Sequence, residues 1–249
     1  MPTFDSAGVQ IHYEVFGEGK PIVLVHGFAS SLRENWVAPG WIETLTPLRQ
    51  VIALDCRGHG ESEKPKNPAS YGDEDMGGDV IRLMDHLRID RADLFGYSIG
   101  GRISLGLMVN FPERFTSAVL GGVGGGLARH RTGGKDSPIV HALLTGDRSE
   151  ATEPVAKGVR TFAGRGGNDL KLRAGVRSAQ RRPLDETLAW LSMPVLFVNG
   201  ANDKPVGDPR PIADLLPNSR VVFIPDRDHF TVVGDQRFKD AVVAFLSEA

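Results

Sequence analysis

Short apolar runs rich in β-branched residues alternate along this chain with segments of helical periodicity, and this alternation is the strongest constraint on its fold. Ile22 to Val25 and Val51 to Leu54 are continuous apolar runs, which is typical of strands covered by helices on both faces. Gln10 to Val15 is mixed, which predicts an exposed edge strand. Residues 73–87 carry an apolar stripe at helical spacing, formed by Met76, Val80, Leu83, Met84 and Leu87. The pattern predicts an α/β fold with a mostly parallel central sheet and helices on both faces.

The alternation is interrupted after an expected strand at residues 117–120 and resumes at the apolar run PVLFVNG. The sequence GGVGGG comes first, at 121–126, and lacks both phosphate-loop patterns, so we interpret it as a flexible junction. Residues 127–185 follow with a net charge of +6 and are predicted to form a few helices over the main sheet. This basicity marks either a solvated helical surface, which we favour, or a field that attracts anionic substrates. Residues 1–126 and 186–249 are then two parts of one core, the second with helices near 212–216 and 240–246.

Composition excludes several classes of protein. With 41% hydrophobic and 24% charged residues the chain is globular, and its net charge of −2 gives no excess for binding nucleic acid. Its one cysteine, Cys56, excludes an internal disulfide and any zinc site built from two cysteines of one chain. No apolar run reaches the roughly 18 residues of a membrane span. The opening MPTFDSAGVQ lacks the features of a secretory signal, so the expected location is the cytoplasm.

The most informative motif is GYSIG at residues 96–100, between a predicted strand and an apolar helix. In the pattern G-x-S-x-G, a nucleophilic serine sits on a strained turn, and its flanking glycines remove Cβ atoms that would collide there. The first N–H groups of the following helix point toward the same place and favour negative charge. Ser98 is therefore the candidate nucleophile.

A serine hydroxyl is a poor nucleophile unless a base and an orienting carboxylate accompany it. His229 follows the last predicted strand, and Asp203 follows the strand before it. Because the carboxyl ends of parallel strands share one edge of the sheet, these side chains are expected to meet Ser98 despite their separation in sequence.

Together with GYSIGG, the segments HGF at 26–28 and DCRGHGES at 55–62 give the chain a clear family character. Over nearly its whole length it resembles the α/β-hydrolase superfamily, specifically its small-lidded esterase-like and lactonase-like members. The resemblance implies an α/β-hydrolase fold with a short helical lid at 127–185, and a triad of Ser98, Asp203 and His229. It also implies an oxyanion hole formed by the backbone N–H groups of Phe28 and Ile99. The expected activity is metal-independent and cofactor-free hydrolysis of small carboxylic esters or lactones.

The chain departs from this family next to the histidine, where Asp228 replaces the common glycine. Either this carboxylate raises the pKa of His229, or it points to solvent beside Arg227, which we favour. Some relatives place the triad acid after the strand that precedes the lid. That region is GGVGGG here and contains no acid, which strengthens Asp203.

The remaining reactive side chains have simpler explanations. We expect His26 and His59 to be structural and Cys56 to be a packed thiol. We expect Trp36 and Trp41 to pack the helix that follows the HGF loop, the segment that contains Phe28. His130 and His141 lie in the insertion, where surface or packing roles are favoured over substrate contact, and no metal-binding spacing accompanies them.

The fold and triad leave several reactions open. Ser98 lies at the strand-to-helix turn that is called the nucleophile elbow. A serine there argues against epoxide opening and halide removal, because relatives with those activities use an aspartate at the same position. Carbon–carbon bond hydrolysis, thioester hydrolysis, perhydrolysis and hydroxynitrile cleavage stay open on the same triad. A hydrolase-derived small-molecule receptor is the alternative from another class, and a pseudoenzyme is disfavoured by the complete triad. Substrate size, stereopreference and oligomeric state are not predicted.

Overall fold

A computed structural model describes residues 2–125, 138–145 and 188–248, together with positions 156, 160–161, 163–164, 170 and 174. Most of the predicted insertion at 127–185 therefore lies outside the described residues. Within it the structure describes helix α5, Pro138–Leu144. The division of the chain into two core parts and a helical lid stays a prediction.

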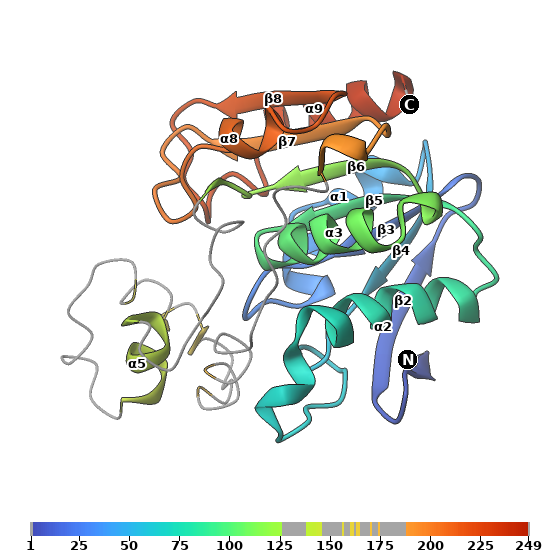
Figure 1. The fold of residues 1–249 in the computed structure, drawn as a ribbon, viewed down its shortest axis with the longest axis vertical. Helices are drawn as coiled ribbons and strands as arrows, with labels where there is room; N and C mark the ends of the chain where they lie inside the picture. Colours follow the sequence, from blue (N-terminus) through green and yellow to red (C-terminus); the bar gives the residue numbers. More distant parts are fainter. Residues whose placement is uncertain are drawn as a thin grey trace.

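Eight strands form one sheet in the order β1-β2-β4-β3-β5-β6-β7-β8 (Figure 1). The strands are β1 Thr3–Asp5, β2 Gln10–Phe16, β3 Pro21–Val25, β4 Gln50–Leu54, β5 Ala92–Tyr97, β6 Phe115–Gly121, β7 Val195–Gly200 and β8 Ser219–Ile224. From β4 to β8 all neighbouring strands are parallel, whereas β2 is antiparallel to β4 and β1 is antiparallel to β2. The expected α/β-hydrolase sheet is confirmed.

The expectation of an edge strand at residues 10–15 is wrong. A short N-terminal strand, β1, pairs with β2 from Thr3 opposite His12 to Asp5 opposite Gln10, and it takes the edge position. Three residues with little apolar content carry no clear strand pattern, so this partner of β2 was not predictable from the sequence.

The helical elements follow the strands along the chain. They are η1 Arg33–Val37, α1 Trp41–Leu45, η2 Pro68–Tyr71, α2 Asp73–His86, α3 Ile99–Asn110, η3 Pro112–Arg114, η6 Leu188–Trp190, α8 Arg210–Ala213 and α9 Gln236–Glu248. The helix predicted at 73–87 is confirmed as α2, and its apolar stripe is buried through Leu83 and Met84. The C-terminal helix is longer than expected, and α8 begins two residues earlier than its predicted start.

Two apolar cores cover the two faces of the sheet. Val23 and Val25 of β3 belong to the core that also contains side chains of α2, α3 and α8. Ile22 and Leu24 point the other way, into a core with side chains of α1 and α9. This alternation along one strand is the two-residue period of β structure. Because both faces of β3 are covered by apolar cores, all of its residues are apolar and form one continuous run in the sequence.

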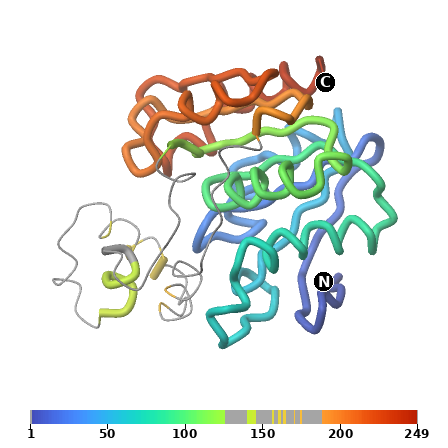
Figure 2. The backbone as a smooth tube through the Cα atoms, viewed as in Figure 1, coloured from blue at the N-terminus to red at the C-terminus, as the bar shows by residue number. Residues whose placement is uncertain are grey.

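Helix α5 lies to one side of the sheet and its covering helices (Figure 2). Val140 and Leu143 of α5 join Ala29 in a small apolar cluster against which Phe28 packs. The helix and the loop that follows β3, where the HGF motif lies, thus share one apolar cluster.

The glycines after β6 serve close packing. A Cβ on Gly124 would lie 2.3 Å from the carbonyl oxygen of Gly207, and Gly122 has a φ of +59° beside His229. Residues 121–125 are buried, so the interpretation of this run as a flexible junction is corrected for them. Their small size lets the strand end approach the loops after β7 and β8.

Candidate active site

The structure brings Ser98, Asp203 and His229 together at the carboxyl ends of β5, β7 and β8. His229 Nε2 lies 2.9 Å from Ser98 Oγ, and His229 Nδ1 lies 2.8 Å from Asp203 Oδ2. The Asp203 side chain is 1% exposed and that of His229 is 12% exposed. A buried carboxylate therefore supports an imidazole that faces the hydroxyl.

The two contacts of the imidazole suit one of its tautomers. An ionised carboxylate only accepts hydrogen bonds, so the proton of His229 belongs on Nδ1, facing Asp203. Nε2 then carries a lone pair toward the Ser98 hydroxyl. This is the tautomer that a general base for serine requires.

Ser98 sits on a strained turn between β5 and α3. Its φ of 55° and ψ of −116° lie in a region that residues with a Cβ rarely occupy. Its backbone N–H donates to the Gly121 carbonyl at 2.7 Å, which anchors the turn to β6. A Cβ on Gly100 would lie 2.0 Å from the Val25 carbonyl oxygen, and one on Gly96 would lie 2.4 Å from the Gly100 oxygen. The requirement for both glycines is confirmed.

This close approach gives a stability prediction with an internal control in the same helix. Gly100→Ala is expected to lower the free energy of unfolding by about 3 kcal/mol, because its methyl group collides with rigid backbone. Gly106, also in α3, has open space around the Cβ position, so Gly106→Ala should stabilise by up to about 1 kcal/mol. Urea unfolding of both variants measures the difference. Equal midpoints would show that the elbow tolerates a side chain.

Asp228 is exposed and shapes the turn that carries His229. Its Oδ1 accepts hydrogen bonds from the N–H of Phe230 at 3.0 Å, and from the N–H and hydroxyl of Thr231 at 2.9 and 2.8 Å. The Thr231 hydroxyl, followed by these N–H groups, holds the pKa of Asp228 below its ordinary value although burial opposes the shift. Arg227 pairs with Asp235 at 2.6 Å. The favoured interpretation, a solvent-facing carboxylate, agrees with this geometry.

The loop after β3 is held from both sides. Gly27 N–H donates to Asn35 Oδ1 at 3.0 Å, while His26 Nδ1 donates to the Gly27 carbonyl at 2.7 Å. His26 Nε2 accepts from the Cys56 N–H at 3.0 Å, so both ring nitrogens serve the loop and the structural explanation of His26 is confirmed. Phe28 follows directly. Asn35 was not singled out in the sequence, because an amide that caps a distant backbone N–H leaves no local pattern.

Ile99 is the first residue of α3, so its N–H belongs to the helix turn that has no intrahelical acceptor. This end of the helix starts beside Ser98. The structure thus places a free helix terminus next to the candidate nucleophile, as the motif predicts.

The other candidates have structural roles. His59 is buried, with Nδ1 3.0 Å from the Arg57 carbonyl oxygen and its ring edge-on to His26. Burial, followed by the charges of Asp79 and Asp55, raises the pKa of Cys56, so it stays a packed thiol. Trp36 and Trp41 lie in η1 and α1, the helices that follow the HGF loop, and both are buried and pack against Phe95.

His141 is exposed on α5, and His130 lies outside the described residues. In the described part of the chain, no three His, Cys, Asp or Glu side chains lie close enough together to hold a metal ion. None of the described helices is both long and apolar enough to cross a bilayer.

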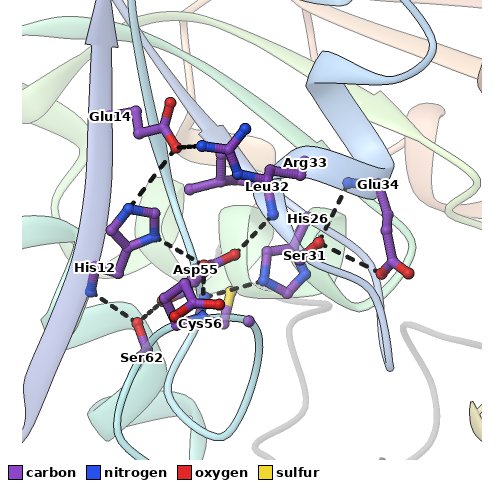
Figure 3. A network of polar contacts seen from close by, with 12 residues as sticks. His12, Glu14, His26, Ser31, Leu32, Arg33, Glu34, Asp55, Cys56 and Ser62 are labelled. Atoms are coloured by element: carbon purple, nitrogen blue, oxygen red, sulfur yellow. Dashed lines mark hydrogen bonds and ion pairs between the residues drawn. The ribbon is translucent and has the colours of Figure 1, made fainter. Parts of the chain in front are cut away.

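Asp55, the first residue of DCRGHGES, links three segments around the loop (Figure 3). It accepts hydrogen bonds from the Leu32 N–H at 2.7 Å, the Glu61 N–H at 2.9 Å and His12 Nδ1 at 2.9 Å. His12 belongs to β2, so this buried carboxylate ties the HGF loop and its own motif to the sheet. The sequence pointed to the motif but not to His12.

Asp55→Asn is expected to lower the free energy of unfolding by about 3 kcal/mol at pH 7, because buried donors lose their charged acceptor. Burial raises the pKa of Asp55, but the nearby His26 imidazole and the N–H groups of Leu32 and Glu61 outweigh it, so the folded-state pKa is lowered. This stabilisation is complete above the unfolded-state pKa and disappears as the pH falls through the folded-state pKa. The variant should therefore lose less stability than wild type on acidification below about pH 4.

Denaturant titrations from pH 7 to 3 measure both effects. Asp208→Asn is the control, because this exposed carboxylate pairs only with Arg210 among the contacts the structure gives it, and the variant should change stability by less than about 0.5 kcal/mol. Equal losses in the two variants would contradict the role of Asp55.

Comparisons with known proteins agree with this fold. A model of the alpha/beta hydrolase fold matches residues 20–130. A putative 2-succinyl-6-hydroxy-2,4-cyclohexadiene-1-carboxylate synthase of Bacillus subtilis is 25% identical over 262 residues, which cover 94% of each chain. The 3-oxoadipate enol-lactonase 2 of Acinetobacter baylyi is 35% identical over 121 residues, 47% of this chain and 43% of that protein.

Among solved structures, the enol-lactonase from Burkholderia xenovorans LB400 superposes with a TM-score of 0.78 at 26% identity, covering 99% of this chain and 100% of the other. The chain therefore has the fold of the alpha/beta hydrolases. Its sequence and structure are similar to those of enol-lactonases.

Proposed function

We propose that this protein is a serine hydrolase that cleaves small carboxylic esters or lactones through an acyl-enzyme on Ser98. The observation that carries the proposal is the imidazole of His229, 2.9 Å from Ser98 Oγ and 2.8 Å from the buried Asp203 carboxylate. The likeness to two enol-lactonases supports the substrate class.

In the proposed reaction, Ser98 Oγ attacks the carbonyl carbon while His229 Nε2 takes the hydroxyl proton. The carbonyl oxygen becomes an oxyanion, for which the N–H groups of Phe28 and Ile99 are the candidate donors. The intermediate collapses, the alkoxide leaves with the proton from His229, and the acyl group remains on Ser98. Water then repeats the sequence with His229 as base, which releases the acid and restores the hydroxyl. Asp203 stabilises the imidazolium in both halves.

A second candidate function is a reaction that uses the same three side chains but does not consume water. It is favoured by one observation: a relative whose match covers 94% of each chain is named as a putative synthase. In such a reaction His229 removes a proton from the substrate, the electron pair left behind forms a new double bond as a leaving group departs, and the proton passes from His229 to that leaving group, so no solvent oxygen enters the product.

Turnover of a substrate panel in H₂¹⁸O separates these candidates. The panel contains short esters, lactones, thioesters and β-diketones, and each is tested with wild type and with Ser98→Ala. The proposal expects fastest turnover of an ester or lactone, with one solvent oxygen in the acid product and loss of turnover in the variant. Fastest turnover of a β-diketone or thioester would replace the substrate class. A product without solvent oxygen would favour the second candidate, and one slow cycle that leaves a stable adduct would favour the receptor alternative.

A further inference from the structure

Tyr97, the residue before Ser98, contacts the same histidine from a different side. Its hydroxyl donates a hydrogen bond to the backbone carbonyl of His229. Its ring lies 5.5 Å from the imidazole, centroid to centroid, with 33° between the planes. Two consecutive residues therefore touch His229: Ser98 at the ring nitrogen and Tyr97 at the main chain.

This contact joins two segments that are far apart in the sequence. His229 lies in the stretch between the end of β8 and the start of α9, which contains no helix or strand. The hydrogen bonds of Asp228 shape that stretch locally, whereas the Tyr97 hydroxyl ties it to the end of β5, the strand that presents the nucleophile. The distance from Nε2 to Oγ depends on the relative position of these two segments.

The surroundings of Tyr97 make it a stable donor. The side chain is buried, and Gly122 leaves room for it, since a Cβ there would lie 3.1 Å from Tyr97 Cζ and 3.0 Å from His229 Cε1. Burial, and then the charges of Asp203 and Asp228, raise the pKa of Tyr97 well above its ordinary value. The Tyr97 hydroxyl therefore keeps its proton at every pH at which an imidazole acts as a base.

We propose that Tyr97 is a positioning residue that sets the distance between His229 and Ser98 through the His229 main chain. The inference rests on the proposed hydrolase function. A small displacement of the general base lowers the rate of the chemical step and does not change substrate binding. Loss of the Tyr97 hydroxyl should therefore lower kcat and leave KM unchanged.

Tyr97→Phe tests this, with Tyr71→Phe as a matched control. Tyr71 is also buried, and its hydroxyl also donates to a backbone carbonyl, that of Pro65 at 2.6 Å. The measurements are kcat and KM on the best substrate of the panel, the rate of inactivation by a fluorophosphonate per titrated active site, and the melting temperature. The inactivation rate reports activation of Ser98 without a bound substrate.

Tyr97→Phe is expected to lower kcat and the inactivation rate by about tenfold, with KM within about twofold of wild type. Tyr71→Phe should lower the melting temperature by a similar amount and leave both rates within about twofold. The proposal is overturned if the two variants have the same rates per active site, or if Tyr97→Phe only reduces the number of titratable sites. A wild-type protein whose Ser98 the reagent does not modify would overturn the hydrolase function, and the positioning role with it.

Discussion

Replacing Ser98 by alanine is expected to lower kcat for ester or lactone hydrolysis by about a millionfold while the protein stays folded. Without Oγ no acyl-enzyme forms, and His229 and Asp203 have no hydroxyl to activate. The substitution keeps a Cβ at the same strained backbone position, so the elbow still closes around Gly96 and Gly100. Initial rates on the best panel substrate, together with a thermal melt, measure both parts of the prediction.

Ser247→Ala is the matched control. Ser247 lies in α9, is exposed, and donates a hydrogen bond to the Val243 carbonyl at 2.8 Å. This variant should retain the wild-type rate. If Ser98→Ala and Ser247→Ala were equally active, the nucleophile would lie elsewhere.

Asp203→Asn is expected to lower kcat by about ten thousandfold, although the side chain keeps nearly the same size. An amide turned with its NH₂ toward His229 donates to Nδ1, which forces the imidazole proton onto Nε2. That nitrogen then cannot accept the proton of Ser98, 2.9 Å away. An amide turned the other way preserves the tautomer but stabilises the imidazolium less, because it carries no charge.

Asp228→Asn is the informative comparison, because Asp228 directly precedes His229. This carboxylate is exposed and bound to Phe230 and Thr231, so its replacement should lower kcat by less than about tenfold. Steady-state kinetics of both variants decide which carboxylate supports the imidazole. A loss in Asp228→Asn as large as that in Asp203→Asn would transfer the role to Asp228.

Features set by local physics were predictable from the sequence. A continuous apolar run such as Ile22 to Val25 requires cover on both faces, and the two cores supply it. The glycines at 96 and 100 follow from the crowding of a strand-to-helix turn, and the structure places backbone oxygens where their Cβ atoms would be. The candidate triad followed from the common edge of parallel strands, with His229 and Asp203 one strand apart.

Features set by long-range contact were not predictable in this way. The pairing of His12 with Asp55 joins β2 to a loop 43 residues later. The residues next to His12 in the sequence form no pattern that predicts a carboxylate partner. The hydroxyl of Tyr97 meets a backbone carbonyl, which every residue possesses, so the sequence holds no signal for the choice of His229. The edge strand β1 was missed because pairing to β2, and not its own composition, makes it a strand.

We propose that one hydroxyl, that of Ser98, is activated by an imidazole and a carboxylate from two later loops. Labelling with a fluorophosphonate, followed by peptide mapping by mass spectrometry, tests it most directly, because the reagent needs an activated serine and no knowledge of the substrate. We expect one adduct per chain, on Ser98, formed far more slowly in Asp203→Asn. Absence of an adduct, or an adduct on another residue that persists in Ser98→Ala, would contradict it.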